Sequence, residues 1–200
     1  MDVTAWNDDL RSRLLERRTV LLSGVLDDAS AGDLATQLMM LDATGDGTVH
    51  LQIDCVGQGL DAAFTVMDTI DLLGVPVHAT CLGRVEGAAV GVLAVCHKRL
   101  AAAHARIRLR DPELGIEGSA SEIARYVAQA TKRLDSFHGR IAAACRRTTE
   151  EVATASAEGR FMSADEAKSF GLVDDIARRG ATIHAWPGVG LGFRPPARRG

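Results

Sequence analysis

Short apolar runs alternate with amphipathic stretches through most of this chain. The runs Thr19–Ser23, Thr48–Asp54 and Pro76–Leu82 predict strands, because each is short and either apolar or alternating in polarity. Residues 27–42 and 63–73 carry apolar side chains at helical spacing and predict helices between those strands. Repeated strand–helix–strand units imply parallel strands joined by right-handed crossovers. We therefore predict an α/β fold.

The pattern continues in shorter elements. Gly87–Cys96 predicts a helix of small apolar residues that is buried on all sides. Two short strands follow it, Arg99–Ala103 and Arg106–Leu109, and a last strand is predicted at Leu172–Ile176. We expect one domain over residues 1–178. The stretch 179–200 is dominated by Gly, Pro and Arg, and we expect a loosely ordered tail there.

Residues 121–147 predict a single long helix with a heptad-like apolar seam. Spacings of four and three residues alternate along the seam, which consists of Ile123, Val127, Ala130, Leu134, Phe137 and Ile141. Such a seam packs either on its own domain or on another subunit, and the spacing alone leaves both alternatives open.

Charge and composition exclude several kinds of partner. The net charge of −3 gives no positive field that would attract nucleic acid or anionic lipid. No apolar run reaches the ~18 residues of a membrane span, and the first residues lack the pattern of a signal peptide. The four cysteines form no C-x-x-C pair, so we expect no metal site. A cytoplasmic protein with no nucleic-acid or membrane partner is expected.

A first glycine turn lies between a predicted strand and a predicted helix. Gly57, Gly59 and Ala62 satisfy the G-x-G-x-x-A form of a dinucleotide-binding turn, and Arg84 follows the next strand, where a 2′-phosphate is bound in such folds. No acid follows that strand to bind a ribose. Dinucleotide binding is therefore the lesser alternative, and we expect no cofactor.

A second glycine turn, from Gly83 to Gly91, has the strand–turn–helix layout of a nucleophile elbow. In such an elbow a nucleophile sits at the start of the helix, and nearby amides hold an oxyanion. No Ser, Cys or Thr lies between Gly83 and Val95. The layout is present without the nucleophile.

Several motifs follow one another in an informative order. They are S-R-L-L-x-x-R from Ser12, the strand and glycine turn Leu51–Gly59, A-R-I from Ala105, R-F-M-S-A-D-E-A from Arg160, and F-G-L-V-D from Phe170. In order and spacing they resemble the family of the Clp protease proteolytic subunit, ClpP, over about residues 6–177.

The resemblance implies a ClpP/crotonase-type fold of repeated ββα units, in which the long helix is a protruding handle. It also implies a serine-type endopeptidase that assembles into heptameric rings stacked face to face through the handle helices. On this basis the apolar seam is expected to be a subunit interface, in a homo-oligomer or in a mixed ring. Residues Asn7–Arg17 predict an opening helix. The family's extra N-terminal segment, which helps dock its ATPase, has no counterpart before this helix, which argues against Clp ATPase docking.

The family's catalytic residues do not carry over. The serine position falls on Gly87, the histidine position on Arg110 and the aspartate position on Gly159. Glycine has no nucleophile, and arginine stays protonated and cannot act as a general base. The oxyanion positions fall on Gln58 and Ala88.

Two further expectations concern this altered site. A buried Arg110 requires a nearby acid, and Glu86 and Glu158 are the candidates. Alternatively, His104 and Glu86 support a repurposed activity, as a peptidase or as an acyl-CoA hydratase or hydrolase. The favoured expectation is a subunit without peptidase activity that acts as a structural or regulatory partner of an active ClpP paralogue.

Overall fold

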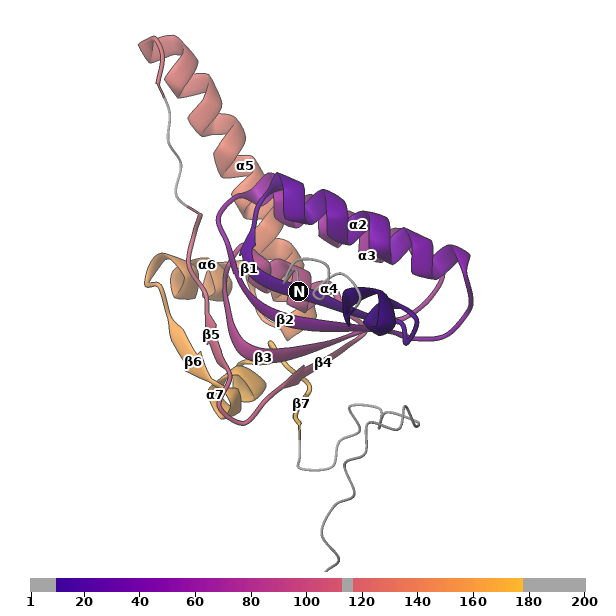
Figure 1. The fold of residues 1–200 in the computed structure, drawn as a ribbon. Coiled ribbons are helices and arrows are strands. Elements are labelled where there is room, and N and C mark those ends of the chain that lie inside the picture. Colours follow the sequence, from indigo (N-terminus) through magenta and orange to yellow (C-terminus); the bar gives the residue numbers. More distant parts are fainter. Residues whose placement is uncertain (1–9, 113–116, 178–200) are drawn as a thin grey trace, which may run out of the picture.

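The computed structural model describes residues 10–112 and 117–177, which form a mixed sheet with helices packed around it (Figure 1). The strands are β1 (Thr19–Leu26), β2 (Val49–Gly57), β3 (Val77–Gly87), β4 (Lys98–Ala101), β5 (Arg106–Arg108), β6 (Phe161–Ser163) and β7 (Asp175–Ile176). The helices are α2 (Asp28–Ala43), α3 (Leu60–Leu72), α4 (Ala89–Val95), α5 (Ala120–Cys145), α6 (Thr149–Ala157) and α7 (Ala164–Phe170), and residues 10–15 are also helical.

The sheet has the order β1-β2-β3-β4-β7, and β5 pairs with the carboxyl-terminal part of β3. These pairings are all parallel, whereas β5 and β6 are antiparallel. The predicted α/β fold is confirmed. Strand β6 was not predicted, because it is only three residues long and carries no pattern of its own.

One face of the sheet holds the core. Along β2, Val49, Leu51, Ile53 and Cys55 are fully buried, whereas the residues between them are half-buried or exposed. Helices α2, α3 and α4 pack on the buried face. The opposite face remains partly open, with Leu21 of β1 43% exposed and Leu82 of β3 45% exposed. Parallel sheets are normally covered on both faces, so this open face is unusual for one subunit.

Helix α5 begins with a capping box. The side chain of Ser119 accepts from the amide of Glu122, and the Glu122 carboxylate accepts from the amide of Ser119. The helix extends beyond the rest of the domain at its N-terminal end (Figure 1). Only its C-terminal part, from Phe137 to Cys145, contains buried residues.

This arrangement corrects part of the expected interface. Phe137 and Ile141 are 2% and 0% exposed within the subunit, so these two seam residues belong to its own core. They lie in the part of α5 that packs against α4. The other four seam residues remain half-buried or exposed, and Val127 is 46% exposed. Their role as an interface stays a prediction.

The predicted tail over 179–200 and the first residues of the helix predicted over Asn7–Arg17 lie outside the residues that the structure describes. Within the described part of the chain, no helix combines the length and apolar character needed to cross a bilayer. In the same residues, no group of three or more His, Cys, Asp or Glu side chains is arranged to hold a metal ion.

Candidate functional site

Strand β3 enters α4 through a turn that requires glycine at position 87. Gly87 is buried and has a φ of +60°, in the left-handed region that side chains disfavour. It pairs in register with Gly57 of β2, and a Cβ at position 87 would lie 2.6 Å from the Gly57 carbonyl oxygen. The turn has the expected elbow layout, but it is built for a residue without a side chain.

Arg110 lies directly against this turn. A Cβ at position 87 would be 3.6 Å from Nε and 3.7 Å from Cγ of Arg110. The structure therefore brings together the two positions that the resemblance assigns to the family's serine and histidine. A side chain added at position 87 would contact Arg110.

The third position repeats this pattern. Gly159 has a φ of +63°, and a Cβ there would lie 3.1 Å from Nη2 of Arg108. Arg108 Nε donates to the Gly159 carbonyl oxygen at 3.2 Å, and its guanidinium lies 4.3 Å above the Phe161 ring centroid. The side chain of Arg108 thus lies beside the position that the resemblance assigns to the catalytic aspartate.

The two expected oxyanion positions lie on either side of Gly57. The Ala88 amide donates to the Gly57 carbonyl at 3.3 Å, so this donor already has an acceptor within the protein. Gln58 is exposed between β2 and the first residues of α3. A Cβ at Gly57 itself would lie 2.2 Å from the Ala89 amide nitrogen. Close packing of β2 on the start of α4 therefore explains why Gly57 is glycine, without a bound dinucleotide.

The expected ion pair of Arg110 with Glu86 or Glu158 stays a prediction. Arg110 has interactions of its own, but the ion pairs within residues 10–112 and 117–177 do not join it to Glu86 or Glu158. Glu86 pairs in register with Arg108 instead, and Glu158 is the C-cap of α6. Both acids are held at other positions by the strand register and by the helix end.

The alternative acid–base pair is that of His104 and Glu86. His104 is exposed in the turn before β5, whereas Glu86 is in register with Arg108. Within residues 10–112 and 117–177, no hydrogen bond or ion pair joins the two side chains. The site therefore adds no support to this acid–base pair, which stays a prediction.

The sequence patterns gave no sign of a buried imidazole next to the site. His138 of α5 is 3% exposed, and its Nε2 lies 2.9 Å from Oδ1 of Asp111. The pair ties α5 to the residue that follows Arg110. The two residues are 27 positions apart in the chain, and nothing in their local sequence signals the contact.

The nearest thiols do not replace the missing nucleophile. Burial raises the pKa of Cys55 to about 11 and that of Cys81 to about 12. Thiols with such values are protonated near neutral pH and are weak nucleophiles. Cys55 and Cys81 are buried in the core of the sheet, where they act as small apolar side chains.

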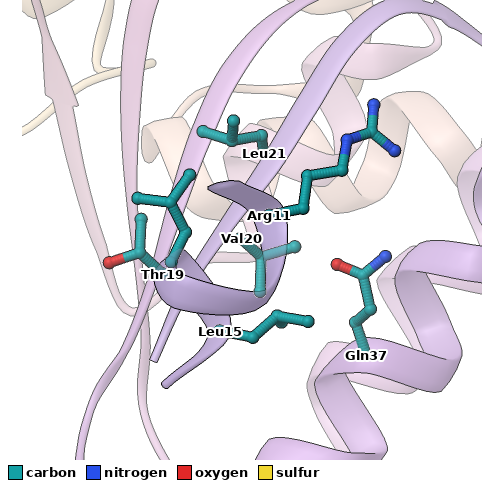
Figure 2. A pocket seen from close by; sticks show the side chains of 7 residues that line it. Arg11, Leu15, Thr19, Val20, Leu21 and Gln37 are labelled. Carbon is teal, nitrogen blue, oxygen red and sulfur yellow. The ribbon is translucent and has the colours of Figure 1, made fainter. Parts of the chain in front are cut away.

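Two hollows lie elsewhere on the subunit. The first, between the helical residues 10–15, β1 and α2, is lined by Leu15, Val20 and Gln37 among others (Figure 2). Its volume of about 20 Å³ accommodates a water molecule and no larger ligand. The second is an open groove between α6 and Phe170, and Glu158 lies on its rim. Neither hollow includes Gly87, Arg110 or Gly159.

Comparison with known families agrees with this geometry. The model of the Clp protease family matches residues 3–180, which is most of the chain. The match covers the elbow at Gly87, the strand that leads to Arg110, and the turn at Gly159. The sequence has glycine, arginine and glycine at these three positions. The chain belongs to the Clp protease family.

Proposed function

We propose that this chain is a ring-forming Clp-type subunit that lacks peptidase activity and acts as a structural or regulatory partner of active Clp subunits. One observation carries the proposal: each glycine at a catalytic position contacts an arginine side chain, Gly87 with Arg110 and Gly159 with Arg108. These positions supply no hydroxyl or thiol nucleophile and no general base. In this proposal the subunit acts in the cytoplasm, and no cofactor is needed.

The arrangement of the elbow adds support. Catalysis of acyl transfer depends on amides that point at a developing oxyanion, and the loss of one such donor costs a factor of about 10²–10³ in rate. The Ala88 amide is already bonded to the Gly57 carbonyl. The proposed loss of activity therefore rests on the oxyanion donors as well as on the three substituted residues.

Surface apolar residues support assembly. Leu21, Val25 and Leu82 are each more than 40% exposed on β1 and β3, and Tyr126 and Val127 are exposed on α5. Exposed apolar residues gathered on two surfaces favour burial against other subunits. A closed ring, either of identical chains or mixed with an active paralogue, is the assembly proposed here.

The test of inactivity is turnover of small fluorogenic peptides together with labelling by a fluorophosphonate probe. Loss of the nucleophile or the base costs on the order of a millionfold in a serine protease, so we expect no signal above a blank. An active Clp subunit purified in the same way is the positive control. Turnover that follows the protein peak through a second purification would contradict the proposal.

Matched variants distinguish a new activity from a contaminant. His104→Ala and Glu86→Gln remove the side chains of the alternative acid–base pair at half-buried or exposed positions. If turnover is observed and either variant abolishes it, the alternative enzyme is correct. If both variants retain it, neither side chain is responsible. Turnover that is lost on a second purification then belongs to a contaminating peptidase, whereas turnover that follows the protein peak still contradicts the proposal of an inactive subunit.

A further inference from the structure

Four arginines gather on the sheet face beside the substituted catalytic positions. Arg106 and Arg108 of β5, and Arg110 just beyond it, alternate with two residues that are at most 1% exposed, so the three side chains leave the chain on the side opposite to those buried residues. Arg84 of β3 pairs in register with Arg106. We call Arg84, Arg106, Arg108 and Arg110 the arginine row.

The positive charge of the row is only partly compensated. Within residues 10–112 and 117–177, the guanidinium groups of Arg84 and Arg106 make no hydrogen bond or ion pair. Asp54 lies nearby but accepts the backbone amide of Arg84 at 2.9 Å, and Glu86 is beside Arg108 in the register. Like charges directly opposite on neighbouring strands are destabilising, which favours an anionic ligand between them.

Arg108 is fixed in place for such a ligand. Its Nε is bonded to Gly159 and its guanidinium lies over the Phe161 ring. Among residues 10–112 and 117–177, the two terminal amino groups of Arg108 form no ion pair. An arginine held by its Nε and its ring contact loses little side-chain freedom when those amino groups bind a carboxylate.

We propose that the arginine row binds an extended acidic peptide of a partner protein, with carboxylates at every second residue. Side chains on one face of an extended chain recur every ~6.6 Å, which matches the spacing of Arg106 and Arg108 along β5. Arg110 follows two residues further along the chain. Guanidinium groups bind carboxylates through paired, charge-assisted hydrogen bonds. Exposed Phe161 and Leu82 supply apolar contacts beside the charges, which favours a peptide over a purely ionic polymer.

This inference goes beyond the proposed function and stands without it, because peptide binding does not depend on whether the subunit cleaves peptides. The test is fluorescence anisotropy of a fluorescein-labelled peptide of alternating Glu and Thr, titrated with the full chain. A peptide with Gln in place of Glu is the ligand control. We expect saturable binding of the Glu peptide that weakens as salt is added, and binding of the Gln peptide at least about 10-fold weaker.

Paired variants locate the site. Arg84→Gln with Arg106→Gln removes two exposed charges of the row, and Arg125→Gln with Lys132→Gln removes two charges of α5. The first pair is expected to weaken Glu-peptide binding by about 10-fold or more, and the second to leave it unchanged. Thermal unfolding followed by circular dichroism checks that both variants are folded to the same extent.

Four results would overturn the proposal. Equal binding of the Glu and Gln peptides would show that carboxylates are not recognised. An equal loss in both double variants would show that only net charge matters. Tighter binding of oligouridine RNA or polyphosphate than of the Glu peptide would assign the row to a different ligand. A change in oligomeric mass on Arg84→Gln with Arg106→Gln would assign it to a subunit interface.

Discussion

At the residue scale, glycines decide where backbone and side chains meet most closely. Gly91 of α4 faces α3 and α5, and a Cβ at this position would lie 2.3 Å from Cε2 of Phe137 and 2.8 Å from Sδ of Met67. The ring of Phe137 is 2% exposed and fills the space that a side chain at position 91 would occupy. The anchorage of α5 on the domain therefore depends on a residue without a Cβ.

We expect Gly91→Ala to lower the free energy of unfolding by about 1–3 kcal/mol, because the added methyl group forces Phe137 and Met67 out of a close-packed core. Denaturant unfolding followed by circular dichroism measures the change. Gly139→Ala is the matched control, since a methyl group at position 139 of α5 would meet no neighbouring element within 4 Å. The control should be neutral or stabilising by up to about 1 kcal/mol. Equal stability of the two variants would show that α4 and α5 are less closely packed.

At the element scale, one arginine joins the ends of several helices and strands. Arg99 of β4 donates to the carbonyl oxygens of Ala144 at 3.2 Å and Gly171 at 3.0 Å, and it forms an ion pair with Asp174. The carbonyl groups belong to the last turn of α5 and to the C-cap of α7. Only 12% of the Arg99 side chain is exposed. These contacts, which we call the Arg99 clamp, replace the hydrogen bonds to water that the buried guanidinium has lost.

The clamp predicts a pH-dependent contribution to stability. Burial alone would raise the pKa of Asp174, but hydrogen bonds from Arg99 and its charge outweigh this and hold the pKa below the ordinary value of 3.8. A lowered pKa in the folded state means that the contribution is complete well above the ordinary value and is lost as the pH falls through the folded value. Asp174→Asn should therefore cost about 1–2 kcal/mol at a pH of about 7 and progressively less near a pH of about 3.

Denaturant titrations at several pH values measure this difference. Asp175→Asn serves as the control, because Asp175 pairs with Lys168 where both side chains are nearly half exposed. Pairs of that kind contribute at most about 1 kcal/mol. A difference between wild type and Asp174→Asn that stays constant from neutral pH down to acid pH would contradict the assignment.

Elements with a strong period were predictable from sequence, and contacts between distant residues were not. The alternation in Thr48–Asp54 predicted β2, because period-two burial follows directly from the strand pleat. The apolar seam of α5 predicted the helix but not its division into a buried and an exposed half, because the apolar residues have the same spacing in both halves. The contact of Arg108 with Gly159 spans 51 positions and depends on the antiparallel pairing of β5 with β6.

For the candidate site, motif order assigned the family's catalytic positions to Gly87, Arg110 and Gly159, and this assignment stays a prediction. The structure adds that Arg110 lies beside Gly87. The pairing of Glu86 with Arg108 could not be predicted, because no local pattern specifies strand register. The side chain of Arg108 was missed because its partner is a backbone carbonyl.

At the scale of the whole molecule, the exposed half of α5 is the surface on which the proposed assembly depends most. Val127 and Tyr126 are 46% and 48% exposed there, near half-buried Ile123 and Ala130. The domain leaves this stripe uncovered, whereas the same helix contains buried residues from Phe137 onwards. The proposed ring would cover it with another subunit.

We expect Val127→Glu to reduce the assembled mass measured by light scattering, because it places a charge within the apolar stripe. Gln129→Glu adds the same charge at an exposed position away from the stripe and should leave the mass unchanged. Both variants should unfold at the temperature of the wild type. If Val127→Glu assembles fully, the contact between subunits lies elsewhere, with the open sheet face as the next surface to test.

The projection of α5 also has a thermodynamic consequence. None of residues 120–132 is buried, and an isolated helix of this length is only marginally populated in water. The capping box at Ser119 stabilises the first turn by about 1 kcal/mol, which offsets the nucleation cost only in part. In a separated subunit this segment is therefore subject to a helix–coil equilibrium. Part of the free energy of association is then used to order the helix, so subunits bind less tightly than their contact area alone would predict.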